Sequence, residues 1–101
     1  MEISEMQKQS FEILEKINEK SDVEHDVGGM ILSLVEEIGE VARELSKKQS
    51  NYRGEFRKEY LADELVDVIS RTAVIASDNG IDLEEAVVRK FKKINERFKL
   101  E

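Results

Sequence analysis

The sequence predicts an all-α protein, an antiparallel four-helix bundle that forms a single domain over residues 1–101. Three observations favour this fold. Apolar residues recur at the three- and four-residue spacing of an amphipathic helix in four separate segments. The chain has no proline and only five glycines, so few residues would interrupt a helix. The links between the segments are short, which is typical of neighbouring antiparallel helices.

The first two predicted helices cover residues 3–20 and 30–48. In the first, Ile13, Leu14 and Ile17 fall mostly on one stripe. In the second, apolar residues fill a broad arc of the helix surface. The link "SDVEHDVGG" separates the two, and its two glycines favour a break between them.

The third and fourth predicted helices follow the loop "QSNYRGE". The third covers residues 56–77 and ends at "DNG", where Asn79 or Gly80 can adopt the left-handed conformation that closes a helix. The fourth begins at Asp82, which with Glu85 three residues later forms an Asp-headed variant of the capping box. Its apolar positions continue to Phe98.

The composition excludes several classes of function. The formal net charge of −7 argues against nucleic-acid binding through a broad basic face. The absence of cysteine excludes disulfides and thiolate chemistry. No run of 18 apolar residues is present, and the N-terminus lacks the order of a signal peptide, so we expect a cytoplasmic protein with no membrane partner.

Carboxylates lie at the same edge of the apolar arc in the second and third helices. Glu37 and Glu40 are one turn apart in the second helix, and Glu64 and Asp67 are one turn apart in the third. If the two helices pack through their apolar arcs, these edges meet. We therefore expect four carboxylates to converge beside the core.

Four carboxylates at close range repel one another, and partial burial adds to the cost. Either some of them stay protonated or cations fill the site. Hard divalent cations prefer oxygen ligands, and Mg²⁺ in particular binds carboxylates together with substrate phosphates. Such ions would let a polyphosphate approach an otherwise acidic protein. From the residues alone, an ordinary solvated acidic face remains the alternative.

The two acidic segments also carry a family resemblance. "EEIGE" at residues 36–40 reads EExxE, and "ELVD" at residues 64–67 reads ExxD. In this order, followed by "NGIDLEEAV" and "KKINERF", they resemble the MazG-like all-α nucleoside triphosphate pyrophosphohydrolases. The resemblance covers about residues 30–98.

The resemblance implies an activity. Such enzymes use Mg²⁺, with Mn²⁺ a possible substitute, to cleave a nucleoside or deoxynucleoside triphosphate into its monophosphate and pyrophosphate. It also implies a homodimer or homotetramer and a role in removing unwanted nucleotides from the pool. The expected metal ligands, which are also catalytic residues, are Glu37, Glu40, Glu64 and Asp67. Glu36 is expected to assist catalysis, either behind the ligands or by positioning the attacking water.

The fourth helix supplies the expected substrate contacts. Lys90, Lys93 and Arg97 share one strip and resemble the basic residues with which the family meets phosphates, and Asn95 is a candidate contact for the base or sugar. A solvated basic face near the end of a helix is the alternative interpretation.

Two other functions remain open. Phosphoribosyl-ATP pyrophosphohydrolase has similar helices and metal chemistry, although the EExxE form and "KKINERF" fit the MazG-like group better. A non-catalytic helical module for dimerisation or regulation would use the same apolar arcs without a working site. A di-iron carboxylate bundle is disfavoured because it needs ExxH pairs on its helices, whereas the single histidine, His25, falls in a link.

Overall fold

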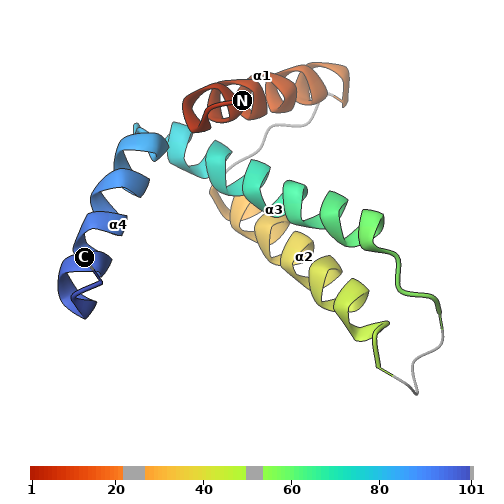
Figure 1. The fold of residues 1–101 in the computed structure, drawn as a ribbon. Helices are drawn as coiled ribbons and strands as arrows, with labels where there is room; N and C mark the ends of the chain where they lie inside the picture. The colour runs from red at the N-terminus through yellow and green to blue at the C-terminus, as the bar shows by residue number, and fades with distance from the viewer. Residues whose placement is uncertain (22–26, 50–53, 101) are drawn as a thin grey trace.

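The computed structural model describes residues 1–21, 27–49 and 54–100, and these residues form four helices and no strand. The helices are α1 (Ile3–Ser21), α2 (Val27–Ser46), α3 (Lys58–Asp78) and α4 (Leu83–Phe98). The predicted all-α fold is therefore confirmed. Figure 1 shows α3 at the centre, with α2 antiparallel beside it, α1 across its C-terminal half, and α4 leading away from the α2–α3 pair.

The helix ends differ from the prediction mainly in α2. This helix begins at Val27, so Gly28 and Gly29 lie in its first turn rather than in the link. Glycine lowers helix propensity without forbidding a helix, and the burial of Met30 holds this turn against the core. His25 lies outside the described residues. The C-terminal end comes at Ser46, because the next three amides each donate to the carbonyl three residues back, as in a 3₁₀ turn.

The small core lies where α1, the start of α2 and the second half of α3 meet. Leu14, Met30 and Val74 are buried there, and Ile75 packs against them. Ala73 and Ala76 of α3 are also buried. The core thus stabilises the α1–α3 and α2–α3 contacts and leaves most of α4 outside it.

The corner between α3 and α4 follows the predicted capping. Of the two candidates for the left-handed position, Gly80 adopts it with φ of 66°, whereas Asn79 has φ of −102°. Asp82 caps α4, since its Oδ1 accepts a hydrogen bond from the Glu85 amide at 3.1 Å. A glycine at the turn and an acidic cap after it therefore fix where α3 ends and where α4 begins.

Gln7 of α1 holds this corner in place. Its Nε2 donates to Ser77 Oγ at 3.1 Å and to the Ile81 carbonyl at 2.8 Å. Its Oε1 accepts from the Leu83 amide at 3.0 Å, which satisfies one of the free amides at the start of α4. One side chain of α1 therefore ties the end of α3 to the start of α4 and sets the direction that α4 takes.

Two glycine substitutions should change stability in opposite directions. At both Gly80 and Gly39, an added Cβ meets no atom within 4 Å, so only the backbone conformation differs. Gly80→Ala should lower the free energy of unfolding by about 1 to 2 kcal/mol, because alanine is strained at positive φ. Gly39→Ala, inside α2, should raise it by about 0.5 to 1 kcal/mol through helix propensity. Chemical denaturation measures both, and equal effects would contradict the assignment of Gly80.

Candidate metal centre

The antiparallel contact between α2 and α3 brings the two acidic segments together. Toward the C-terminus of α2, successive turns of one face carry Ser33, Glu37 and Glu40. Toward the N-terminus of α3, successive turns of one face carry Arg71, Asp67 and Glu64. Three levels result. Ser33 is joined to Arg71 at the first level, and the four carboxylates lie together at the next two.

Four carboxylates converge as the sequence predicts. One oxygen from each of the four lies within 4.8 Å of the others, and the four residues are Glu37, Glu40, Glu64 and Asp67. The side chains of Glu37, Glu40 and Glu64 are half-buried at the edge of the α2–α3 contact. Apolar neighbours therefore exclude part of the water that would otherwise solvate these charges.

Two of the buried oxygens lack a hydrogen-bond partner. Oε2 of Glu37 and Oε2 of Glu64 are buried and accept no hydrogen bond from the described residues. Buried polar atoms are nearly always satisfied in folded proteins, so such orphaned acceptors call for a ligand. Negatively charged oxygens at this spacing suit a hard divalent cation, and the four carboxylates thus fit a metal ion.

The chain's similarity to known proteins agrees with this geometry. The family model of the MazG nucleotide pyrophosphohydrolase domain matches residues 25–100. The chain belongs to the MazG family. No curated protein and no solved structure matches the chain. In this MazG domain, EExxE lies on α2 and ExxD on α3, and the two half-motifs meet at one carboxylate cluster.

Without a cation, protons reduce the repulsion in the cluster. The pKa of Glu64 rises from 4.5 to about 7, chiefly because its carboxyl group shares a hydrogen bond with Glu40. Burial and the negative charges of Glu40, Asp67 and Glu37 raise it further. Near neutral pH, Glu64 of the metal-free MazG domain is therefore protonated for part of the time.

The second perturbed group is Glu37. Burial raises the pKa of its carboxyl group most, and the charges of Glu40 and Asp67 add to the effect. The positive charge of Arg71 acts in the opposite direction and favours the ionised carboxylate. The cluster thus contains both acids that resist ionisation and a nearby cation that promotes it.

Sequence reasoning missed Arg71 and its partner. Arg71 Nε donates to Ser33 Oγ at 3.0 Å, which joins α3 to α2 one turn beyond the carboxylates. The sequence does contain a signal for this pair, because Arg71 follows Asp67 by four residues and Ser33 precedes Glu37 by four. Both therefore lie on the side of the α2–α3 pair that carries the four carboxylates, which we call the carboxylate face. Recognising the pair also required the register between the helices.

The opposite end of the cluster carries a second cation. Glu44, only 6% exposed, lies one turn beyond Glu40, and its Oε1 accepts from Lys47 Nζ at 2.9 Å. Lys47, which directly follows α2, therefore neutralises a buried carboxylate near the end of that helix.

The remaining predicted site residues lie apart from the cluster. Glu36 is exposed on α2 and is not among the four converging acids. Within one chain, α4 packs against α1 and leads away from α2 (Figure 1), so it does not bring its polar residues to the carboxylates. The roles predicted for these residues therefore stay predictions, and the residues on α4 are Lys90, Lys93, Asn95 and Arg97.

Within residues 1–21, 27–49 and 54–100, no helix is long and apolar enough to cross a membrane.

The raised pKa of Glu64 predicts how stability depends on pH. Between pH 4.5 and about 7 the folded metal-free protein holds a proton that the unfolded chain has released. Stability from this group is therefore present at low pH and is lost as pH rises through about 7. Melting temperatures in EDTA should show Glu64→Gln stabilised relative to wild type, with a difference that grows from pH 5 to pH 8. Glu59→Gln, at an exposed position of α3, is the matched control. A difference that shrinks with rising pH would contradict the assignment.

Proposed function

We propose that this MazG domain is a Mg²⁺-dependent nucleoside triphosphate pyrophosphohydrolase that converts a ribo- or deoxyribonucleoside triphosphate into its monophosphate and pyrophosphate. The observation that carries the proposal is the convergence of the two half-motifs on one half-buried cluster of four carboxylates. A cluster of this charge repels phosphates unless cations neutralise it. A metal-dependent reaction on a polyphosphate therefore fits it better than any reaction of the carboxylates alone.

The carboxylates of Glu37, Glu40, Glu64 and Asp67 would hold Mg²⁺ or Mn²⁺. When bound, the ion supplies charge neutralisation of the phosphates and lowers the pKa of a water molecule. In the reaction, the oxygen of water bonds to the α-phosphorus, and the bond from that phosphorus to the bridging oxygen breaks. Pyrophosphate leaves with the bridging oxygen, and the proton of the water passes to a nearby base. We assign Glu36, an exposed residue that precedes Glu37 in the sequence, to orient the attacking water.

The substrate also needs positive charge from the protein. We assign phosphate contacts to the exposed basic strip of α4, formed by Lys90, Lys93 and Arg97, and a base or sugar contact to Asn95. Because α4 leads away from the carboxylates of its own chain (Figure 1), these residues would act on the cluster of another copy. The substrate assignment is therefore linked to self-association.

Product analysis tests the reaction. With Mg²⁺, a panel of nucleoside triphosphates should yield monophosphate and pyrophosphate, and EDTA should abolish turnover. In water enriched in ¹⁸O, the label should enter the monophosphate, because attack occurs at the α-phosphorus. Glu40→Gln and Glu64→Gln should each lower kcat/KM by a factor on the order of 100 or more. Glu59→Gln should leave it unchanged.

Other products would change the assignment. Diphosphate with orthophosphate would place the attack at the γ-phosphorus and would contradict the proposal. Turnover of phosphoribosyl-ATP alone would favour the histidine-pathway reaction. If no nucleotide reacts and the Gln variants only raise the melting temperature, a non-catalytic helical module is the better description.

We also propose that the chain works as an assembly of identical copies. Its accessible surface is 8106 Å², about 2,200 Å² more than a compact monomer of this size exposes. Its radius of gyration is 16.5 Å, compared with about 13 Å for a compact domain of 100 residues. The excess area is within the range that one subunit contributes to an obligate homodimer. Contact with a second copy of the chain would bury this excess area.

The surface to be covered lies on the α2–α3 pair, on the side opposite the carboxylates. Half of the apolar arc of each helix faces the other helix, and the remaining half is solvent-exposed. The exposed residues are Ile31, Val35, Ile38, Leu45, Leu65 and Ile69, each between 45% and 58% exposed. We call this set the apolar face. Burying it against a second copy would leave the carboxylate side open to substrate.

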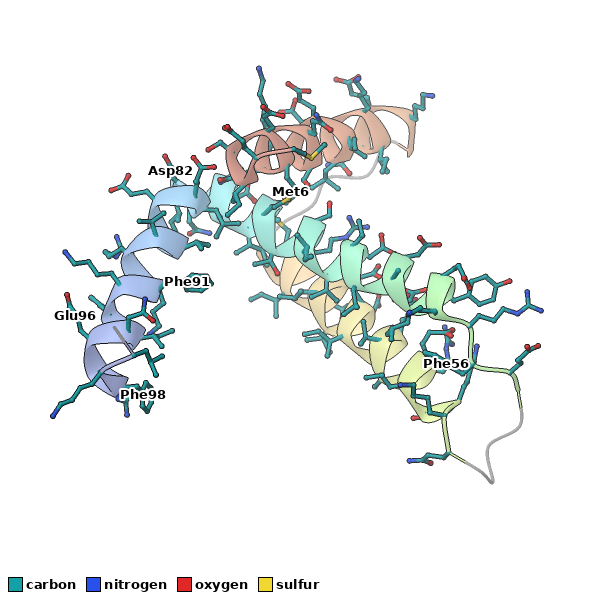
Figure 2. All side chains as sticks on the ribbon, in the orientation of Figure 1. Met6, Phe56, Asp82, Phe91, Glu96 and Phe98 are labelled. Atoms are coloured by element: carbon teal, nitrogen blue, oxygen red, sulfur yellow. The ribbon has the colours of Figure 1, made fainter. Side chains whose placement is uncertain are left out.

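A second unpartnered surface lies on α4. Figure 2 shows Phe91 and Phe98 projecting from α4 with no other helix beside them, and their side chains are 61% and 60% exposed. The basic strip borders this apolar stripe, just as the carboxylates border the apolar arcs of α2 and α3. Contact between α4 of one copy and another copy would therefore bring charges of opposite sign together.

Changing the apolar face should alter the size of the assembly. At micromolar concentration, wild type should elute as a dimer or larger species in size-exclusion chromatography with light scattering. Ile38→Glu should shift it toward the monomer, because it places a charge at the centre of the apolar face. Gln49→Glu adds the same charge at an exposed position after α2 and should have no effect. A wild type that is monomeric at this concentration contradicts the assembly.

A further inference from the structure

Arg71 lies beside four carboxylates but forms no ion pair among the described residues. It lies half-buried on the carboxylate face of α3, one turn beyond Asp67. Its charge is close enough to Glu37 to lower the pKa of that carboxyl group. Yet the ion pairs among the described residues are Lys47 with Glu44 and Arg57 with Glu55, and neither includes Arg71.

The guanidinium is instead fixed by a neutral partner. Nε donates to Ser33 Oγ across the helix contact at 3.0 Å. Within residues 1–21, 27–49 and 54–100, the two terminal nitrogens have no hydrogen-bond partner, so four N–H donors remain available beside the cluster. A guanidinium held through Nε keeps both terminal nitrogens for a ligand, and such a group can bind a phosphate through two parallel hydrogen bonds.

We propose that Arg71 binds the pyrophosphate portion of the nucleotide, with Ser33 holding its guanidinium in position. This inference rests on the proposed function, since it assigns an orientation to the substrate of that reaction. The β- and γ-phosphates carry most of the negative charge of a triphosphate, and they therefore face the cation whose charge is not already neutralised. Once a divalent ion neutralises the carboxylates, a phosphate can approach Arg71 without repulsion from Glu37 and Asp67.

The opposite end of the face suits the nucleoside. Two cations near that end already have carboxylate partners, since Lys47 pairs with Glu44 at 2.9 Å and Arg57 with Glu55 at 3.6 Å. Tyr60 lies on α3 one turn before Glu64 and is 49% exposed, with the Arg57 guanidinium 5.5 Å from the centre of its ring. Tyr60 and Arg71 are separated by about 16 Å along α3 at the helical rise of 1.5 Å per residue. A nucleoside triphosphate in extended form spans a distance of this order, so the base end and the pyrophosphate end fit the two ends of the face.

Binding of pyrophosphate tests the assignment without knowledge of the base. Isothermal titration calorimetry of the full chain with pyrophosphate in Mg²⁺ should give wild-type binding that Arg71→Met weakens by a factor on the order of 10 to 100. Arg71→Lys should be intermediate, because the charge remains but the paired donors are lost. Ser33→Ala should weaken binding a few-fold, and Ser33→Thr, which keeps the hydroxyl group, should restore it. Arg43→Met removes an exposed arginine of α2 and is the matched control.

A second titration separates phosphate contact from support of the cluster. Binding of Mn²⁺ alone should be unchanged or tighter in Arg71→Met, because a repelling positive charge has been removed. A parallel loss of Mn²⁺ and pyrophosphate affinity would assign Arg71 to the support of the carboxylates and overturn the proposal. Circular dichroism melts verify that each variant is folded.

The remaining outcomes distinguish this inference from the function on which it rests. Equal pyrophosphate affinity in wild type and Arg71→Met overturns the role of Arg71 and leaves the pyrophosphohydrolase assignment standing. Failure of wild type to bind either Mn²⁺ or pyrophosphate overturns both.

Discussion

The antiparallel contact between α2 and α3 is the constraint on which the other features of the molecule depend. A step of three or four residues along one helix is matched by an equal step back along the other, so one face of the pair holds a column of polar side chains. The way each helix is turned about its own axis also places the exposed half of its apolar arc on the other face of the pair. One packing contact thus generates both the carboxylate cluster and the apolar face.

The carboxylate cluster costs stability in the isolated chain. Four acids within 4.8 Å repel one another, and two of their buried oxygens have no hydrogen-bond partner among the described residues. The raised pKa values of Glu37 and Glu64 show how a metal-free protein reduces this cost, because a shared proton replaces part of the missing positive charge. A divalent cation would reduce the same repulsion more completely. Local violations of packing rules of this kind are typical of functional sites.

The cations around the cluster differ in what remains available to a ligand. Lys47 forms an ion pair with the buried Glu44, whereas Arg71 is held by the neutral Ser33 and forms no ion pair among the described residues. The two ends of the carboxylate face are therefore electrostatically unequal. This difference would orient a bound nucleotide along the face, which the symmetric arrangement of the four acids alone would not do. The core is small, and Gln7 holds α4 in a direction that leads away from the α2–α3 pair. Apolar side chains on α2, α3 and α4 therefore stay exposed, and we propose that a second copy of the chain covers them.

The sequence by itself determined the local features of this protein. Apolar periodicity and the lack of proline were sufficient for four helices, and Asp82 was identified as the cap of α4 because capping involves only neighbouring residues. The four carboxylates could also be anticipated, since each pair lies at a fixed edge of its own helix.

Only the tertiary structure decided how these helices meet. The early start of α2 depends on the burial of Met30 in a core built from three helices. Ser33 and Arg71 are 38 residues apart, and Gln7 lies 74 residues from the carbonyl of Ile81 that it binds. Helical periodicity specifies which side of a helix a residue occupies, but it does not specify the register or the angle at which that side meets another helix. These depend on packing between distant segments, and they determined the partners of Arg71 and the course of α4.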